Sequence, residues 1–379
     1  MRWYMSEGLS VQLAYLNFGL VMVGAVLFRK YMGATSKTCL LWFIYYIMYY
    51  AFGILAMGIN GFQTSLIPTF IPIIYFIGYF VLLSNKQLFK EFVYFATVCF
   101  VLTAIVTLTL YLFNFNLIEQ DTQEWAIDRA DGVYGDANNA ALASLVAFLL
   151  FDRVFRPKNL LLRVVKIGIQ LIIFYSLFVT FSTTGLFAFT VTFMLTNYKL
   201  FRGLRLALFV LFVILFYQGL FILSSEVTNL GLTKAQQDKI MNITNLLTFN
   251  FDKVDNSGRG DLLHNILYYI NENPILGNGI NFSNEHRGHN TFVGNWVDGG
   301  LLTFLFFLFL ILTYYFNALK LSINLRFFVI SVMFIMSIFM ISLQSVINQP
   351  YLLVIFVFMA YLFHYNKTEP EHLSFLDKD

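Results

Sequence analysis

Four side chains that could act on a phosphate or a hydroxyl lie in one polar segment, residues 224–300, which separates long apolar runs. They are Arg259, Arg287, His289 and Asn290. A guanidinium is always charged, and its planar fork of donors matches phosphate oxygens. The proton equilibrium of histidine lies near neutral pH, so a histidine can take a proton from a hydroxyl or, when charged, stabilise an anion. These residue types together favour chemistry at a phosphorylated substrate.

Arg259 comes at the expected start of a short helix in the stretch S-G-R-G-D-L-L-H-N-I-L-Y-Y-I. Apolar residues recur at helical spacing over 262–270, Asp261 falls in the first turn, and Asn273-Pro274 ends the pattern. A helix N-terminus favours anions, so Arg259 and the backbone amides beside it predict a phosphate cradle. The structural alternative is an ion pair of Arg259 with Asp261 or Asp255.

His289 belongs to the stretch G-H-N-T-F-V-G-N-W-V-D-G-G, which leads straight into an apolar run. We expect it to be the acid–base group, although a loop histidine can also be merely solvated. His264 lies on the short amphipathic helix, and we expect it to be non-essential. Asp298 opens the next helix in a favourable position for the helix dipole, and Gly299 and Gly300 allow close backbone approach. For these three residues a purely structural role is the alternative.

The composition is that of a membrane protein. Hydrophobic residues make up 59% of the 379 positions and charged residues 12%, against about 25% charged residues in soluble domains. The chain has too little charge to give a large soluble core a polar surface, so we predict a polytopic membrane protein. The net charge of +3 comes from basic residues spread among short loops, which argues against nucleic-acid binding. Cys39 and Cys99 lie inside apolar runs and form neither a disulfide framework nor a metal-binding spacing.

The fold expected from the apolar runs is all-α, with about 11 (10–12) transmembrane helices. The chain then divides into transmembrane helices 1–8 (residues 1–223), a large loop (224–295), transmembrane helices 9–11 (296–366) and a polar tail (367–379) that we expect to be disordered. The expected spans are about 9–28, 38–59, 66–83, 91–113, 137–151, 164–182, 185–199, 204–223, 296–316, 327–347 and 351–365.

Lys and Arg residues predict the orientation, because they concentrate on the cytoplasmic side of membrane proteins. Most of the 24 basic residues fall in alternating loops, and those loops exclude both 114–136 and 224–295. The large loop is therefore expected outside the cytoplasm. The acidic loop 114–136 ends at D-A-N-N-A-A, where Asp136 or Asn138 before an alanine-rich run signals a helix N-cap.

Three stretches of the polar segment resemble the signature of the O-antigen ligase and polymerase superfamily (Wzy_C type). They are S-G-R-x-x-L at 257–262, N-P-I-L-G-N-G at 273–279 and H-N-T-F-V-x(4)-D-G-G at 289–300. The weaker D-A-N-N-A-A at 136–141 resembles a D-P-N-x-x-A element of the same family, which points to Asn138. The resemblance covers the signature and the helical frame, and the same elements serve several enzymes within the superfamily.

The resemblance implies a GT-C-like membrane fold with one large helical periplasmic loop, in the bacterial inner membrane. It implies a metal-independent glycosyltransferase without a cofactor, which moves a glycan from undecaprenyl diphosphate to a sugar hydroxyl. Its partners would be the undecaprenyl-diphosphate-linked oligosaccharide, the lipid bilayer and a chain-length regulator. By resemblance, Arg259 would contact the diphosphate and His289 would assist the acceptor hydroxyl or the leaving phosphate. The implied substrate-binding residues are Arg287, Asn290, Asn138, Asp261 and Asp298.

The sequence departs from the family pattern in two places. Many members have Ser-Arg before the seventh helix, and that Arg is expected to contact phosphate, whereas this chain has Ser182-Thr183-Thr184-Gly185. Arg287, two residues before His289, is our candidate for the missing cation. The usual Glu at the opening of the ninth helix is Asp298, which we interpret as a tolerated variant.

Three functions compete. The first is a repeat-unit polymerase (Wzy type) for O-antigen or capsular polysaccharide, favoured by a fairly short chain rich in Phe, Ile and Asn. The second is the ligase that joins O-antigen to lipid A–core. The third is a flippase or transporter, which predicts ionisable residues at mid-membrane depth and repeated halves. Neither feature is visible in this sequence.

Overall fold

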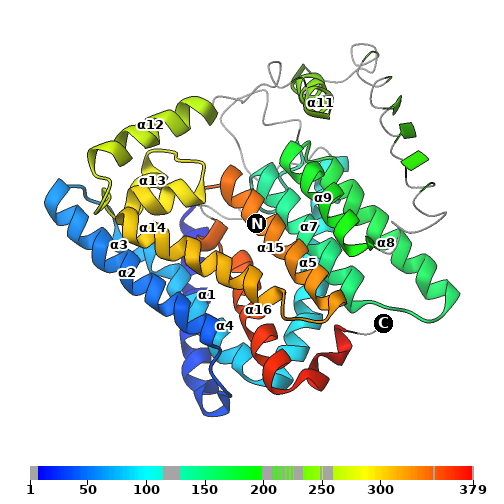
Figure 1. The fold of residues 1–379 in the computed structure, drawn as a ribbon, viewed down its shortest axis with the longest axis horizontal. Coiled ribbons are helices and arrows are strands. Elements are labelled where there is room, and N and C mark those ends of the chain that lie inside the picture. The colour runs from blue at the N-terminus through cyan, green and yellow to red at the C-terminus, as the bar shows by residue number, and fades with distance from the viewer. Residues whose placement is uncertain are drawn as a thin grey trace. The chain divides into compact units, whose positions relative to one another are not determined.

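The computed structural model of the chain is built from helices, and its described part contains no strand (Figure 1). It describes residues 7–113, 129–198, 234–247, 250, 259–344 and 346–377, together with scattered positions between 207 and 225. The chain forms two compact units: unit 1 is Met1–Trp3 with Thr97–Ser257, and unit 2 is Tyr4–Ala96 with Gly258–Asp379. Helices from both ends of the sequence therefore share unit 2, which also contains most of the candidate site.

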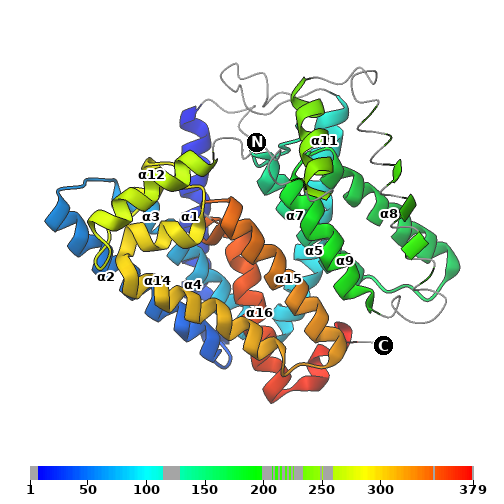
Figure 2. The same cartoon turned by 45° about the horizontal axis from the view of Figure 1, so that its top comes forward.

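Unit 2 is a bundle in which α2 runs along α14 in both views (Figures 1 and 2). Further close pairs are α1 with α4, α4 with α16, and α14 with α15. The helices are α1 (Glu7–Phe28), η1 (Arg29–Tyr31), α2 (Lys37–Asn60), α3 (Leu66–Thr69), α4 (Ile71–Ser84), the first part of α5 (Lys86–Leu112), α12 (Arg259–Glu272), α13 (Phe282–Glu285), α14 (Thr291–Ala318), α15 (Ile323–Ser342), η5 (Val346–Asn348), α16 (Pro350–Thr368) and η6 (Pro370–Phe375).

The core of unit 2 is aromatic and contains a short polar chain. The indole of Trp42 donates to the Tyr314 hydroxyl (2.8 Å), which in turn donates to the Phe356 carbonyl (2.9 Å). All three side chains are buried. Buried polar groups need partners, so this chain satisfies two of them while it joins α2, α14 and α16.

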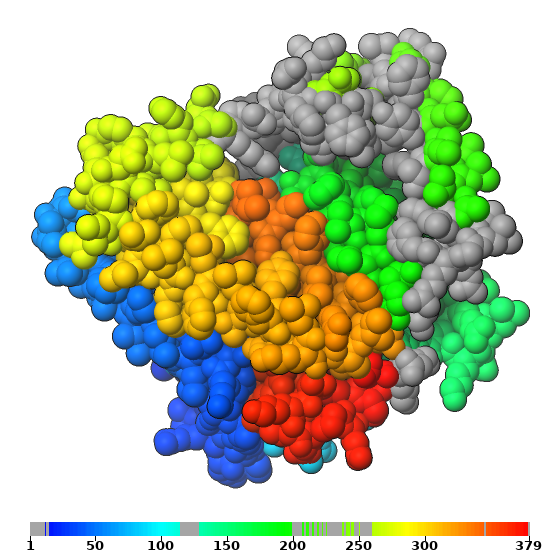
Figure 3. Space-filling view, in the orientation of Figure 1, coloured from blue at the N-terminus to red at the C-terminus, as the bar shows by residue number. Residues whose placement is uncertain are grey.

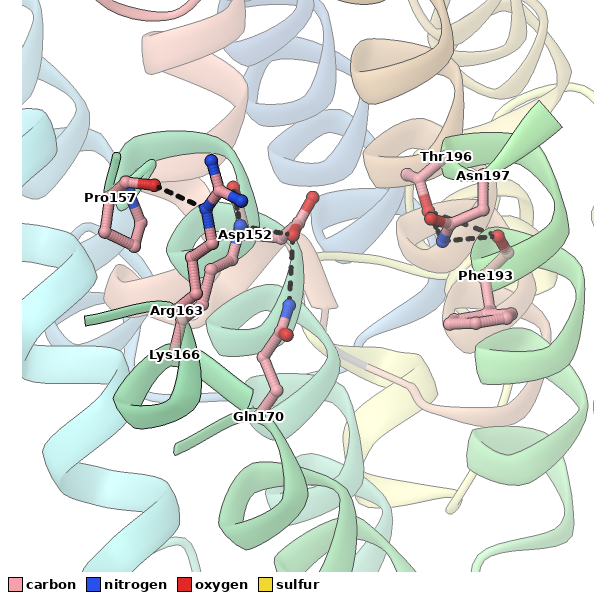
Figure 4. A network of polar contacts seen from close by, with 8 residues as sticks. All are labelled: Asp152, Pro157, Arg163, Lys166, Gln170, Phe193, Thr196 and Asn197. Atoms are coloured by element: carbon pink, nitrogen blue, oxygen red, sulfur yellow. Dashed lines mark hydrogen bonds and ion pairs between the residues drawn. The ribbon is translucent and has the colours of Figure 1, made fainter. Parts of the chain in front are cut away.

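Unit 1 contains the second part of α5, α7 (Ala137–Val154), α8 (Leu160–Phe178), α9 (Thr183–Thr196) and α11 (Lys234–Leu247). The predicted cap is confirmed: the Asp136 carboxylate accepts from the backbone N–H of Asn139 (2.8 Å) at the start of α7. At the other end of α7, Asp152 pairs with Lys166 (2.8 Å) and accepts from Gln170 (3.0 Å), as Figure 4 shows. This end carries one of the basic loops of the sequence.

Among the residues that the structure describes, seven helical segments are long and apolar enough to cross a membrane, which makes the chain a helical polytopic membrane protein. They are α2, Leu66–Ser84 (α3 with α4), α5, α7, α8, α14 and α15. The exposed apolar residues of α14 form a stripe at helical spacing, as a lipid-facing surface requires: Leu302, Leu305, Phe309, Leu312 and Phe316. Helices also occupy the expected spans at α1, α9 and α16, whereas most of 204–223 lies outside the described residues. The total of eleven spans stays a prediction.

The connecting loops of unit 2 lie at its two ends. The topology expected from the sequence assigns these ends to opposite sides of the membrane. At the basic end, Lys86 forms an ion pair with Glu369 (2.7 Å), and Ser322 donates to Asp377 (2.6 Å). At the other end, hereafter the site end, the Asn60 amide donates to the Gly277 carbonyl (3.1 Å). Which of these ends faces the cytoplasm stays a prediction.

The prediction of a disordered tail is wrong for the residues that the structure describes. η6 folds back on the basic end, and Leu373 and Leu376 are buried. Phe375 packs beside Tyr94, with ring centroids 5.8 Å apart, and under the Lys90 ammonium. The tail is polar on average, but three of its apolar residues, Leu373, Phe375 and Leu376, are spaced so that they pack on the bundle.

Candidate active site

The two glycine-containing motifs of unit 2 form a single piece of structure at the site end. The backbone N–H of Asn278 donates to the Val297 carbonyl (2.7 Å), and that of Gly279 donates to the Asp298 carbonyl (3.1 Å). Gly300 has φ +77°, which interrupts α14. A Cβ there would overlap the Ile275 carbonyl oxygen, so only glycine allows this approach. The motifs N-P-I-L-G-N-G and D-G-G are thus two sides of one backbone contact.

Side-chain amides and an indole hold this loop to its neighbours. Asn273 donates to the Asn278 side-chain oxygen (2.9 Å), and the Asn278 amide donates to the Tyr269 carbonyl (3.2 Å). The Trp296 indole donates to the Pro274 carbonyl (2.9 Å). These bonds tie the end of α12 to the first turns of α14. Asn273 and Asn278 therefore belong to the loop architecture rather than to a binding surface.

Asp298 is enclosed and fully engaged with the protein. Only 4% of it is exposed. Its carboxylate accepts from the Ser283 N–H (2.6 Å), the Ser283 hydroxyl (3.1 Å) and the Tyr49 hydroxyl (2.8 Å). Tyr49 in turn accepts from the backbone N–H of Asn281 (3.3 Å). Asp298 thus joins α2, α13 and α14, which favours a positioning role; direct substrate binding by this carboxylate stays a prediction.

Replacing Asp298 separates these two roles. Asp298→Ala leaves buried donors of Ser283 and Tyr49 without an acceptor, at about 1–3 kcal/mol for each. We expect a large fall in the melting temperature of the detergent-solubilised protein and loss of activity. Asp298→Asn keeps the shape and one of the two acceptor oxygens, so it should retain more of the stability and activity than Asp298→Ala. Loss of activity in Asp298→Asn at unchanged melting temperature would instead show that the negative charge of Asp298 acts on the substrate.

The short turn after α13 presents Arg287 and His289 to solvent. His286 is the anchor: its ring stacks on Phe282, with centroids 3.9 Å apart, and its Nδ1 lies 3.0 Å from the Phe282 carbonyl oxygen. Arg287 and His289 are exposed and have φ values of +53° and +42°, on either side of buried Gly288. Left-handed backbone is uncommon for residues other than glycine and gathers at functional sites. The two histidines therefore differ in role: His286 packs against Phe282, whereas His289 lies at the surface.

Asn290 caps α14. Its side-chain oxygen accepts from the backbone N–H groups of Phe292 (2.9 Å) and Val293 (3.1 Å). The helix begins at Thr291, so the expected start at 296 is corrected by five residues. The reason is local, because asparagine is among the best N-cap residues. His289 consequently lies directly before a helix N-terminus, where an anion is favoured.

Arg259 begins α12, as the sequence predicts, while its side chain lies outside the described part of the structure. Asp261 in the first turn and His264 in the second are exposed. Ile266 and Ile270 pack with Phe282 and Val297 against α14. Figure 3 shows α12 and α13 as a continuous surface with the first part of α14. The helix that begins at Arg259 is thereby attached to the element that carries His289.

Asn138 lies in unit 1, with a different set of partners. It is buried, and its side-chain oxygen accepts from the Ser182 hydroxyl (2.9 Å), which itself caps α9. The D-A-N-N-A-A stretch thus meets the S-T-T-G turn that lacks the expected arginine. Arg129 is nearby, because its Nε donates to the Thr180 carbonyl (2.9 Å). Burial raises the pKa of Asp131 above its ordinary value.

Sequence reasoning passed over Arg129 and Asp131. The signal was present, since Arg129 is the one basic residue in the acidic loop 114–136. Within the described residues, no group of three His, Cys, Asp or Glu side chains is placed to hold a metal ion. The structure therefore gathers Arg259, Asp261, Arg287, His289, Asn290 and Asp298 in unit 2 and places Asn138 in unit 1.

The chain was compared with known proteins. No protein-family model matches it, and no curated protein sequence matches it. Function must therefore be inferred from the residues, their geometry and the short motifs.

Proposed function

We propose that this protein is a polysaccharide polymerase of the bacterial inner membrane, with a GT-C-like fold of about eleven spans and its site end in the periplasm. It would transfer a glycan from undecaprenyl diphosphate to a lipid-linked repeat unit, without metal or cofactor. One observation carries the proposal. A cation and a histidine, Arg287 and His289, are exposed in left-handed backbone directly before the N-terminus of α14, at one end of an apolar bundle.

The proposed reaction suits these groups. A sugar hydroxyl oxygen of the acceptor forms a bond to the anomeric carbon of the donor glycan. The bond from that carbon to the phosphate oxygen breaks, and its electron pair goes to undecaprenyl diphosphate. The hydroxyl proton passes to His289 or to the leaving diphosphate. Arg259 and Arg287 would stabilise the charge that develops on the diphosphate, and the dipole of α14 would add to their effect.

The surface of α12 supports a substrate that is anchored in lipid. While one face of this helix packs on α14, Leu263, Leu267 and Tyr268 are exposed, and so is Ile275 just beyond its end. Apolar residues on an exposed helix face at the end of a membrane bundle suit the interfacial region of a bilayer. In that position Arg259 would lie at the depth of the lipid phosphates.

Arg287 tests the proposed second phosphate contact by charge. Alanine, lysine and arginine share the same backbone cost at a positive φ, so differences between these variants report the side chain. We expect Arg287→Lys to keep partial polymerisation, because an ammonium supplies the charge without the fork. Arg287→Ala should keep little. Normal polysaccharide ladders from Arg287→Ala would remove Arg287 from the site and leave Arg129 as the cation to examine.

A lipopolysaccharide gel of a strain that lacks this gene tests the function itself. Loss of a polymerase should leave core carrying a single repeat unit. Loss of a ligase should leave bare core, with lipid-linked polymer accumulating in the membrane. Unchanged ladders would contradict both activities for O-antigen and direct the same test to capsular polysaccharide.

A further inference from the structure

The linker between α15 and α16 lies against the candidate active site. It reads L-Q-S-V-I-N-Q over residues 343–349, between two apolar helices. Val346 and Ile347 anchor it by burial. The Thr291 hydroxyl donates to the Leu343 carbonyl (2.6 Å) and accepts from the Val346 N–H (3.4 Å). Since Thr291 follows His289-Asn290 in the chain, the linker is held beside the N-terminal turn of α14.

Gln344, the residue after Leu343, has an unused hydrogen-bonding group. Its side-chain amide nitrogen is buried and has no partner within the described part of the chain. A primary amide carries two N–H donors, and buried donors in native proteins are nearly always paired. The residue as a whole is only partly buried, so it is not sealed from the surface. No residue that the structure describes supplies a partner for this nitrogen, so it is open to a group from outside the described chain.

Building on the polymerase activity proposed above, we propose that Gln344 binds the acceptor sugar. Its amide would donate to a hydroxyl oxygen of the lipid-linked repeat unit and bind that unit beside the N-terminal turn of α14. A side-chain amide suits a saccharide because it presents donors and an acceptor in one plane. A site that hydrogen-bonds a substrate hydroxyl also rejects sugars that lack it, so Gln344 is a specificity residue.

The test uses the purified full-length protein and the lipid-linked repeat unit extracted from cells that lack this gene. Gln344→Leu removes the donor and keeps the side chain's approximate size. We expect the KM for the repeat unit to rise about tenfold, as for loss of one hydrogen bond, with kcat within about twofold of wild type. The melting temperature should stay the same or rise, because the amide nitrogen has no partner among the described residues to lose.

The matched control is Gln63→Leu, an exposed glutamine in the connection between α2 and α3, which should leave KM and kcat unchanged. An unchanged KM in Gln344→Leu would overturn the inference. It would indicate that the partner of the amide is a buried water molecule. A lower melting temperature with unchanged KM would give Gln344 a structural role instead. Wild-type protein that fails to extend the extracted repeat unit would overturn the polymerase proposal, and this inference with it.

Discussion

Alanine at His289 is expected to abolish polymer while the protein remains in the membrane at normal abundance. The side chain is exposed, and we expect its removal to leave the melting temperature near that of wild type, as for most surface substitutions. The proposed proton transfer is worth about 10²–10⁴ in rate, which is enough to erase a ladder of many successive additions. Polysaccharide gels and membrane immunoblots of the same cells give the measurement.

Two further variants test the same assignment. His289→Asn keeps a polar side chain that tolerates left-handed backbone but cannot titrate near neutral pH, so it should also be inactive. Arg259→Ala should abolish polymer as well, since it removes the cation at the N-terminus of α12. His264→Ala is the control, because His264 is exposed on the same helix and should support normal ladders. Full-length ladders from His289→Ala would contradict the assignment.

Alanine at Gly300 is expected to destroy the site from within the fold. The residue has φ +77°, and its Cβ would overlap the Ile275 carbonyl oxygen. With ψ −179°, Gly300 has a backbone conformation that is essentially restricted to glycine and costs other residues about 1–3 kcal/mol. Overpacking adds about 1–3 kcal/mol. The contact between D-G-G and N-P-I-L-G-N-G should open, which would displace Asp298 and the turn that carries His289. We expect a clear fall in melting temperature together with loss of polymer.

The matched control for Gly300→Ala is Gly58→Ala. Gly58 lies in α2 with nothing within 4 Å of the position of an added Cβ. Its backbone is helical, where alanine is favoured over glycine by about 1 kcal/mol. Gly58→Ala should therefore be as stable as wild type or more stable, with normal ladders. A Gly300→Ala protein with unchanged melting temperature and activity would show that the D-G-G contact does not position the site.

Local signals in the sequence predicted the ends of several helices to within a few residues. The amphipathic pattern after Arg259 and the break at Asn273-Pro274 predicted α12, and Asp136 before an alanine run predicted the start of α7. Hydropathy alone places the start of α14 five residues too late, because Asn290 caps the helix before its apolar run begins. The tail was misjudged by its average polarity, while Leu373, Phe375 and Leu376 supplied enough apolar surface to fold it back.

By itself, the sequence determined that this is a helical membrane protein, because hydropathy is a local property. It also predicts, from residue chemistry, which polar residues could act on a phosphorylated sugar. Only the tertiary structure decided how those residues are used. Asp298 meets Tyr49 across 249 positions of sequence, which encloses a carboxylate that looked available for substrate. Thr291 meets Leu343 across 52 positions, which brings Gln344 to the site. Such contacts depend on which helices become neighbours in the bundle, and no periodicity within a single helix specifies its neighbours.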